Sequence, residues 1–320
     1  MVMEQKIIEF FEKVKNAKSI VLAGHKNPDG DSLCSVLALA HLLELNFGIE
    51  TVCLYDGNIP DSLDNVPLRK RIRYFERVDV DEGFDLAIVM DYGNPVHIGG
   101  PMKAIEKSKF VVEIDHHQND SPIAQLCIND DKAAATAVIV YKMIQVAGLK
   151  IDMQTANLLA LAILTDTGNF KFVRDGRACR VMADLIDFGI NIRNLIELMN
   201  NKPRKAVLLE SKTAADAEFF CNGRLALATV AKKDYKYLDG RGEIVLNLLG
   251  QIQGVEYIVL LKEQKAEQIG VSIRSRKNPI NHIAMALGGG GHERAAGAVV
   301  RDTLDNVKKA VLDLFKKEVL

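Results

Sequence analysis

Short apolar runs bordered by turn residues recur along the first two thirds of the chain. They cover residues 19–24, 49–55, 84–90, 110–114 and 123–128. Runs of this length with such borders are typical of buried strands. Before and between these runs, apolar residues recur at helical spacing over 7–14, 33–43, 133–146 and 155–164. This pattern predicts an α/β fold with an open parallel sheet and flanking helices.

The pattern changes near residue 200. Apolar residues keep helical spacing over 182–200, and the segment NNKPR at 200–204 is rich in residues that break helices. A hairpin turning at Asn222-Gly223, strands at 255–261 and 269–275, and a helix over 304–315 follow. Because 320 residues are long for one domain, we expect a domain at 1–190, a linker at 191–210, and a smaller mixed α+β domain at 211–320. We expect a substrate cleft between the two domains.

Composition narrows the class of protein. Lys and Arg (41) nearly balance Asp and Glu (42), for a net charge of −1, so affinity for long duplex nucleic acid is not expected. The arginine-rich segment 61–75 favours a solvated helix face over a nucleic-acid contact. Five cysteines without paired spacing, and the lack of an apolar signal or membrane-spanning run, favour a cytoplasmic protein that does not associate with membranes.

The segment HKNPDGDS at 25–32 follows the first predicted strand and carries candidate chemistry. His25, Asp29 and Asp31 supply an imidazole and two carboxylates, which suit a divalent ion such as Mn²⁺. Ser32 is expected to cap the next helix, whose N-terminus would favour a phosphate. The alternative is an ordinary turn in which aspartate and glycine have only a conformational role.

Further acidic and imidazole residues follow other predicted elements. Asp91 follows the strand at 84–90, Asp166 follows the helix at 155–164, and Asp115, His116 and His117 follow the strand at 110–114. Ligands gather at the carboxyl ends of the strands of an open parallel sheet, so we expect these side chains to converge with the first group. Carboxylates about 4 Å apart repel by roughly 4 kcal/mol, which favours bound cations. Two divalent ions could activate water for phosphodiester hydrolysis.

The second domain has its own candidate site. Four glycines, Gly288, Gly289, Gly290 and Gly291, precede His292, and Arg274 and Arg276 alternate on the preceding strand. Glycine is costly in ordered structure, so a run of four suggests backbone approach to a ligand. Both arginines would leave the strand on one face, where guanidinium groups bind phosphate well. The alternative is a mobile glycine loop beside two solvated arginines.

The motifs HKNPDGDS, DYG, DHH and TDTGNF together resemble the motifs of the DHH phosphoesterases, and GGGGHERAAGA resembles the signature of their associated C-terminal domain. The resemblance covers nearly the whole chain. Its order and length are similar to the nanoRNase/pAp-phosphatase branch, whose members hydrolyse very short oligonucleotides with Mn²⁺. Tyr92 stands where many relatives have a small residue, so the resemblance does not extend to substrate preference.

The resemblance implies a role for each matching residue. Two Mn²⁺ ions are implied, with Co²⁺ or Mg²⁺ as substitutes. One ion would be held by His25 and Asp29, the other by Asp31, His116 and Asp166, with Asp91 bridging them. Asp115 would orient a ligand and His117 would contact the phosphate. The nucleotide would be held by Arg274, Gly288, Gly289, Gly290, Gly291 and His292.

We therefore expect a Mn²⁺-dependent phosphodiesterase that hydrolyses short oligonucleotides and linear dinucleotides such as pApA to mononucleotides. Two alternatives of the same class are a pAp 3′-phosphatase and a cyclic dinucleotide (c-di-AMP) phosphodiesterase. A processive single-strand exonuclease is disfavoured, because the chain has no tryptophan and no excess of positive charge. A non-catalytic nucleotide-binding sensor is the alternative of another class. A homodimer is compatible with these expectations.

Overall fold

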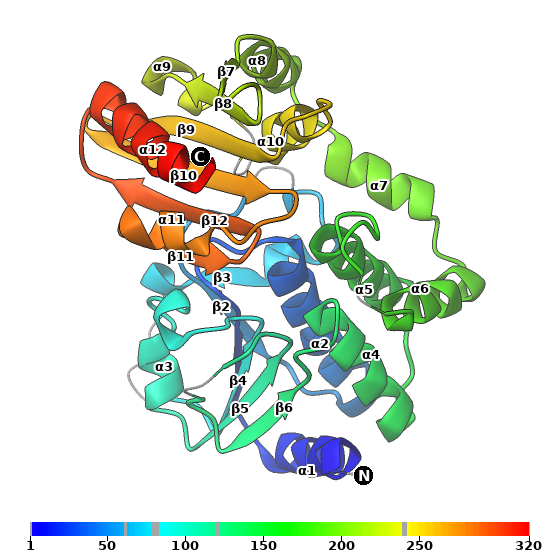
Figure 1. Cartoon of the computed structure of the whole chain (residues 1–320). Coiled ribbons are helices and arrows are strands. Elements are labelled where there is room, and N and C mark those ends of the chain that lie inside the picture. The colour runs from blue at the N-terminus through cyan, green and yellow to red at the C-terminus, as the bar shows by residue number, and fades with distance from the viewer. Residues whose placement is uncertain are drawn as a thin grey trace. The chain divides into compact units, whose positions relative to one another are not determined.

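The computed structural model describes residues 2–60, 63–78, 83–119, 122–173, 175–238 and 242–319. Contacts divide the chain into two compact units, Met1–Asn201 and Lys202–Leu320 (Figure 1). Two helices occupy most of the expected linker, and only residues 201–203 between them are non-helical. The domain bounds expected from the sequence stay predictions, and each unit is described by itself below.

The first unit contains a six-stranded sheet in the order β3-β2-β1-β4-β5-β6, in which every pair of neighbours is parallel. The predicted parallel sheet is confirmed. Its strands are β1 (Ile20–Ala23), β2 (Val52–Tyr55), β3 (Ile72–Tyr74), β4 (Leu86–Met90), β5 (Phe110–Asp115) and β6 (Leu126–Asn129). The strand order reverses between β1 and β4. The carboxyl ends of those two strands therefore form a topological switch point, where ligands bind in folds of this kind.

Helices cover both faces of this sheet (Figure 1), so its central strands are buried on both sides and read as continuous apolar runs. One face is packed by α1, α2, α4 and α5, which share a core with the sheet, and the other by a smaller cluster that includes α3. The helices are α1 (Val2–Asn16), α2 (Gly30–Phe47), α3 (Met102–Glu106), α4 (Thr136–Ala147), α5 (Met153–Asp166), α6 (Arg177–Phe188) and α7 (Ile192–Asn200).

Helices α2 and α5 pack along one another and bring distant parts of the chain together. His41 Nε2 on α2 lies 2.8 Å from Oδ2 of Asp152, which also caps the N-terminus of α5. At the other end of the pair, a Cβ on Gly30 would lie 2.4 Å from Thr165 Oγ1. The start of α2 therefore lies against the end of α5, and both helix ends belong to the candidate site.

One expectation for the first unit is wrong. The arginine-rich segment forms a short 3₁₀ helix over Arg69–Arg71 and then the edge strand β3, not a helix with a solvated face. A three-residue strand is too short to produce a periodic pattern. The helical spacing over 182–200 is confirmed, and the segment is divided between α6 and α7, because Gly189 takes a left-handed conformation (φ 117°) and ends the first helix.

The second unit contains a mixed sheet in the order β11-β12-β10-β9-β8-β7, in which only β8 and β9 pair in parallel. The predicted mixed α+β architecture and the turn at Asn222-Gly223 between β7 and β8 are confirmed. The strands are β7 (Glu218–Phe220), β8 (Leu225–Val230), β9 (Tyr257–Lys265), β10 (Gln268–Ser275), β11 (Gly290–His292) and β12 (Ala295–Val300).

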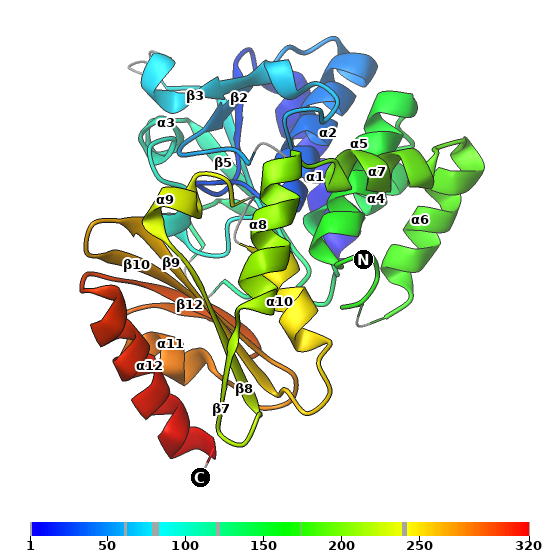
Figure 2. The same ribbon diagram turned by 90° about the horizontal axis from the view of Figure 1, so that it is seen from above.

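Helices also cover both faces of the second sheet (Figure 2). One face packs against α11 and α12, and the other against α8 and α10. The helices of this unit are α8 (Arg204–Ala215), α9 (Lys232–Tyr235), α10 (Glu243–Gly250), α11 (Asn281–Ala286) and α12 (Leu304–Val319). No buried apolar cluster of the described residues contains side chains of both units, as expected for two domains that each bury their own apolar surface.

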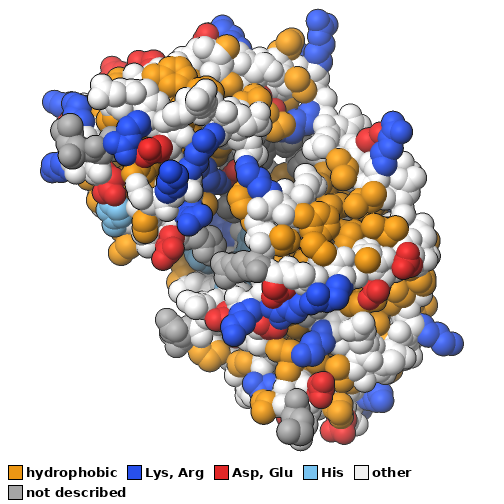
Figure 3. Space-filling view, turned by 45° about the vertical axis from the view of Figure 1, so that its right-hand side comes forward, with side chains coloured by type: hydrophobic (Ala, Val, Ile, Leu, Met, Phe, Trp, Pro, Cys, Tyr) orange, Lys and Arg blue, Asp and Glu red, His pale blue; other side chains and the backbone are white. Residues whose placement is uncertain are grey.

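The surface is mixed in charge. Figure 3 shows Lys and Arg side chains interspersed with Asp and Glu over the face that it presents, as expected for a net charge of −1. Among the helices of the described residues, none is long and apolar enough to cross a bilayer.

Candidate active site

The loop between β1 and α2 folds around the start of the helix. Asp29, not Ser32 as expected, is the N-cap of α2, since its Oδ1 accepts a hydrogen bond from the Ser32 backbone N–H at 3.1 Å. Ser32 Oγ instead accepts a hydrogen bond from the His25 N–H at 3.2 Å. Asn27 holds the loop from outside, because its side-chain oxygen accepts a hydrogen bond from Asn58 N at 2.8 Å. In this loop, His25 Nε2 lies 3.5 Å from Asp29 Oδ2.

The structure brings seven of the eight site residues predicted in the first domain into one cluster of possible metal ligands. His116 Nε2 lies 3.3 Å from Asp91 Oδ1, 3.6 Å from Asp166 Oδ2 and 4.0 Å from Asp31 Oδ2. His25 Nε2 lies 3.5 Å from Asp29 Oδ2 and 4.0 Å from Asp91 Oδ2. Three groups have ligand atoms within 4.8 Å of one another: Asp91, His116 and His117; His25, Asp29 and Asp91; and Asp31, His116 and Asp166.

Asp115, the eighth residue, lies behind this cluster and is fully buried. Its Oδ2 accepts hydrogen bonds from the backbone N–H groups of Tyr92 and Gly93 at 2.9 and 2.8 Å. Its Oδ1 accepts one from the His117 N–H at 2.9 Å and lies 2.8 Å from His117 Nδ1. One carboxylate therefore joins the loop after β4 to the loop after β5 and orients the His117 ring.

Thr136, at the start of α4, is a residue that the sequence analysis missed. Its backbone N–H donates to Asp31 Oδ2 at 2.6 Å, and its hydroxyl donates to Asp91 Oδ1 at 3.1 Å. Ala137 N and Ser35 Oγ also donate to Asp31, at 3.2 and 2.8 Å. The N-terminus of α4 thus holds two carboxylates of the cluster. The sequence indicates this role of Thr136 only by a threonine at the start of an apolar helix.

The carboxylates of the cluster repel one another and favour protonation of their neighbours. Burial and the negative charges of Asp91 and Asp166 raise the pKa of Asp31 well above its ordinary value. Burial opposes protonation of His116, but its hydrogen bond to Asp91 and the surrounding carboxylates outweigh this and raise its pKa to about 10. The pKa of His25 is raised to about 9 in the same way, mainly by Asp29. Buried carboxylates in such numbers call for compensating positive charge.

The side chain of Tyr92 is directed into the core of the fold. Its ring is 2% exposed in the core beneath the sheet, and its hydroxyl donates to the buried Glu113 and accepts from Asn119 Nδ2 at 2.7 Å. The residue fixes the loop between Asp91 and Gly93 from inside the fold. Its unusual size therefore bears on the packing under the loop, not on contact with a ligand.

The predicted site of the second unit is organised by strand register. Arg274 on β10 lies opposite Ala295 on β12, which lies opposite His292 on β11. These residues form one row across three strands, although the side chain of His292 lies outside the described part of the chain. Arg274 is also paired with Glu243, the first residue of α10.

Packing within the fold accounts for one glycine of the run and for the position of Arg276, without a ligand. A Cβ on Gly289 would lie 2.1 Å from Gly297 O, so packing of the backbone alone requires glycine there. Gly290, in contrast, faces open space, as a position for ligand approach would. Arg276 donates to the carbonyl oxygen of Gly250 at the end of α10, where a cation is favourable.

The family comparisons agree with this arrangement. Residues 19–163 match the DHH family, N-terminal domain, and residues 223–319 match the DHHA1 domain. The chain carries a DHH domain followed by a DHHA1 domain. The DHH match contains His25, Asp29, Asp31, Asp91, His116 and His117 of the cluster, and Asp166 lies three residues beyond its end. The DHHA1 match contains Arg274 and the glycine run.

Three similar proteins cover most of the chain. A bifunctional oligoribonuclease and PAP phosphatase NrnA from Thermus thermophilus is 29% identical over 303 residues, which are 94% of this chain and 90% of the relative. A probable manganese-dependent inorganic pyrophosphatase from Bacillus cereus is 28% identical over 231 residues, 68% of this chain and 72% of the relative. A crystal structure of an exopolyphosphatase-related protein from Bacteroides fragilis shares the fold, with a TM-score of 0.90, 22% identity, and coverage of 98% and 97% of the two chains.

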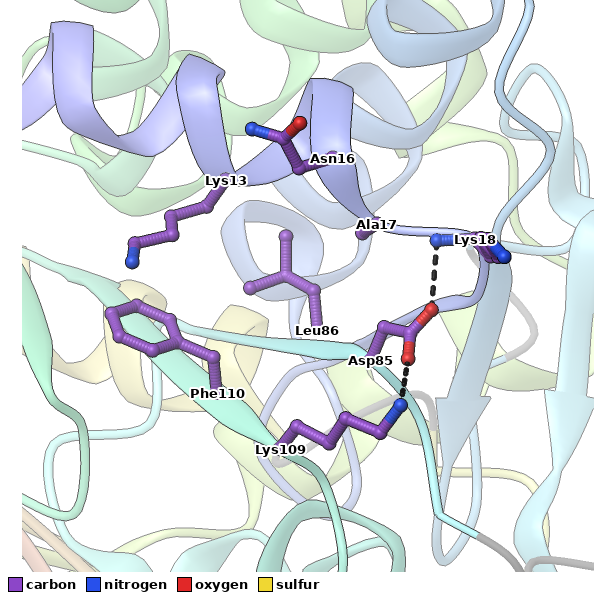
Figure 4. A pocket seen from close by; sticks show the side chains of 8 residues that line it. All are labelled: Lys13, Asn16, Ala17, Lys18, Asp85, Leu86, Lys109 and Phe110. Carbon is purple, nitrogen blue, oxygen red and sulfur yellow. Dashed lines mark hydrogen bonds and ion pairs between the residues drawn. The ribbon is translucent and has the colours of Figure 1, made fainter.

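A separate pocket of about 380 Å³ lies at the opposite edge of the DHH sheet, where β4 and β5 begin (Figure 4). Its one carboxylate, Asp85, is engaged by Lys109 Nζ at 2.7 Å and by the Lys18 backbone N–H at 2.8 Å. None of the predicted site residues lines it. Its lining residues are Lys13, Asn16, Ala17, Lys18, Asp85, Leu86, Lys109 and Phe110.

Proposed function

We propose that this chain is a Mn²⁺-dependent phosphoesterase that hydrolyses short oligonucleotides, linear dinucleotides such as pApA, and pAp. The observation that carries this proposal is the sharing of Asp91 and His116 among the three groups of ligand atoms. Sharing of this kind suits adjacent cations, and the mixture of imidazole nitrogen and carboxylate oxygen suits Mn²⁺. The similarity to a probable manganese-dependent pyrophosphatase supports the same ion.

Each predicted residue has a place in this proposal. His25 and Asp29 would hold one ion, and Asp31, His116 and Asp166 the other, with Asp91 as the shared ligand. When bound, two such ions lower the pKa of a water molecule and neutralise the charge of a phosphoryl group. The carboxylates of the chain supply the negative charge that makes this binding favourable, because Asp31 and Asp91 are at most 2% exposed.

Asp115 orients His117 from behind the cluster, and His117 would face the substrate. Asp115 fixes the His117 ring through Nδ1, which turns the opposite edge of the ring, carrying Nε2, outward. We assign contact with the substrate phosphate to that edge. Although burial opposes protonation of His117, its hydrogen bond to Asp115 raises its pKa. A charged imidazole would bind phosphate more strongly than a neutral one.

The DHHA1 domain would hold the nucleotide. Arg274 offers a guanidinium group for phosphate, and the row that it shares with His292 runs beside the glycines Gly288 to Gly291. Gly288 and Gly290 both face open space, so a ligand could approach the backbone at either glycine. A substrate of one or two nucleotides also agrees with the balanced charge of the chain, which lacks the strong positive field that long nucleic acid attracts.

Both activities in the name of the Thermus thermophilus relative are compatible with this site. Each requires attack of water on a phosphate ester beside a nucleoside. The test is incubation of the purified chain with pApA, and separately with pAp, in the presence of Mn²⁺. We expect AMP from both substrates by chromatography, and none in excess EDTA. Absence of AMP from both substrates at saturating Mn²⁺ would refute the proposal.

A further inference from the structure

The turn after Asp166 returns the chain to the end of α5. Asp166 is the last residue of that helix, and Thr167 caps it. Gly168 and Asn169 both have positive φ (56°), which reverses the chain direction. The Phe172 N–H then donates to the Thr167 carbonyl oxygen at 3.0 Å. Phe172 is thereby held in one hydrogen-bonded turn with the residue next to Asp166.

The turn separates two aromatic side chains. Phe170 packs against the core of the DHH domain, whereas Phe172 is 62% exposed. A single exposed apolar side chain is ordinary on a protein surface. The Phe172 ring differs because it packs closely on the backbone of Gly168. A Cβ on Gly168 would lie only 2.8 Å from the ring atom Cε2. The ring therefore lies against bare glycine backbone.

A positive charge accompanies the ring. Lys171 Nζ lies 5.2 Å from the centroid of the Phe172 ring, within the range of a cation–π contact. An exposed aromatic ring supported by backbone is suited to stack on a nucleobase, and the cation that lies over the ring can move on its flexible side chain to meet a phosphate. Little side-chain entropy would be lost on binding, because the ring is already positioned.

We propose that Phe172, six residues after the cluster residue Asp166, is a stacking platform for a nucleobase of the substrate. The inference rests on the proposed function in that it takes the substrate to be a nucleotide. It adds a base contact within the DHH domain to the phosphate contacts assigned to His117 and Arg274. Because every base has a π-face, such a contact can form with any of the bases. Hydrolysis of short oligonucleotides of different sequence requires this tolerance.

The first test compares substrates with and without the base. Phe172→Ala should lower kcat/KM for pApA by about tenfold, and Phe172→Tyr should restore it to within about twofold. Of two pApA analogues that each lack one adenine, one should be insensitive to Phe172→Ala. Phe188→Ala is the matched control, since Phe188 is 43% exposed at the end of α6, and it should leave kcat/KM unchanged. Equal losses for pApA and both analogues would overturn the inference.

The second test reads binding without catalysis. The chain has no tryptophan, so Phe172→Trp introduces a single indole whose fluorescence reports on its surroundings. AMP should quench this fluorescence in excess EDTA, and ribose 5-phosphate, which has no base, should not. Phe188→Trp should be insensitive to both ligands. Quenching of both variants alike, or of neither, would overturn the stacking role.

The two tests separate the inference from the proposed function. Suppose that the wild-type chain fails to release AMP, but the fluorescence of Phe172→Trp is quenched by AMP and not by ribose 5-phosphate. The base contact then stands and the hydrolytic function fails. If AMP is released while Phe172→Ala matches the wild type and the indole is not quenched, the function stands and the base contact fails.

Discussion

Replacement of Asp91 by asparagine should abolish most of the activity, and more of it than the same change at Asp115. Asp91 takes part in two of the three groups of ligand atoms, so its charge serves both proposed ion positions. Asparagine suits the experiment because Asp91 has a positive φ of 51°, which asparagine tolerates better than alanine. The amide oxygen can still accept the hydrogen bond from Thr136. The fold should therefore survive while a shared ligand is lost.

The expected loss at Asp115 is smaller and follows from its hydrogen bonds. In Asp115→Asn, the amide oxygen can still accept from the N–H groups of Tyr92 and Gly93. The amide nitrogen then faces both the backbone N–H and Nδ1 of His117, so both contacts of Oδ1 are disturbed, and the charge-assisted one to Nδ1 is worth about 1.5–3 kcal/mol. This corresponds to roughly 10–100-fold in kcat/KM, a range similar to that of residues that orient the ligands of a metal site without touching the ion. Asp91→Asn should exceed that range.

The assay measures Mn²⁺ binding by calorimetry and pApA hydrolysis on the same preparations. Asp91→Asn should bind fewer Mn²⁺ ions than the wild type, and Asp115→Asn should bind the same number with weaker affinity. Circular dichroism serves as the control for folding. If Asp115→Asn lost bound Mn²⁺ while Asp91→Asn kept the wild-type number, the assignment of the shared and the orienting carboxylate would be wrong.

Three further predictions each concern one side-chain contact. Thr136→Val removes the hydroxyl that bonds the shared carboxylate and should weaken Mn²⁺ binding about 10–100-fold by calorimetry, whereas Thr136→Ser should not. Glu243→Gln releases Arg274 from an exposed ion pair and should tighten AMP binding about two- to fivefold. Burial opposes ionisation of Asp152, but its hydrogen bond with His41 lowers its pKa. The ionised carboxylate therefore stabilises the fold above the ordinary pKa of 3.8, and this stabilisation is lost as the pH falls. Asp152→Asn should therefore cost about 0.5–1 kcal/mol of unfolding free energy at pH 6 and less below pH 4.

Each of these has a contrary outcome. Unchanged Mn²⁺ affinity in Thr136→Val would show that its hydroxyl has no part in holding the cluster. Weaker AMP binding in Glu243→Gln would mean that the carboxylate orients Arg274 instead of competing for it. A stability difference for Asp152→Asn that grows as the pH falls, in urea titrations, would contradict the sign of the linkage.

Much of the DHH domain could be predicted because its signals are local. Residues that follow parallel strands must meet at one edge of the sheet, so His25, Asp91 and His116 could be grouped before any contact was known. The edge strand β3 could not be predicted, since three residues give no periodicity. The cap of α2 was assigned to Ser32, although Asp29 occupies that position, because either residue type can cap a helix.

Contacts between side chains distant in the sequence were the least predictable. Thr136 reaches Asp31 from 105 positions away, and no spacing rule connects them. Glu243 pairs with Arg274 from 31 positions away, so an arginine assigned to phosphate from its strand alone has a competing partner. The direction of the Tyr92 ring depended on Glu113, a buried acid within an apolar strand that sequence analysis read only as part of the core.

The most direct test of the proposed function is a titration of the metal-free chain with Mn²⁺, in which bound ions and the rate of pApA hydrolysis are measured on the same samples. The shared carboxylate and imidazole predict that the rate reaches its maximum only when two ions are bound per chain, and that EDTA abolishes it. Full activity with one bound ion, or undiminished release of AMP in excess EDTA, would contradict the two-ion site.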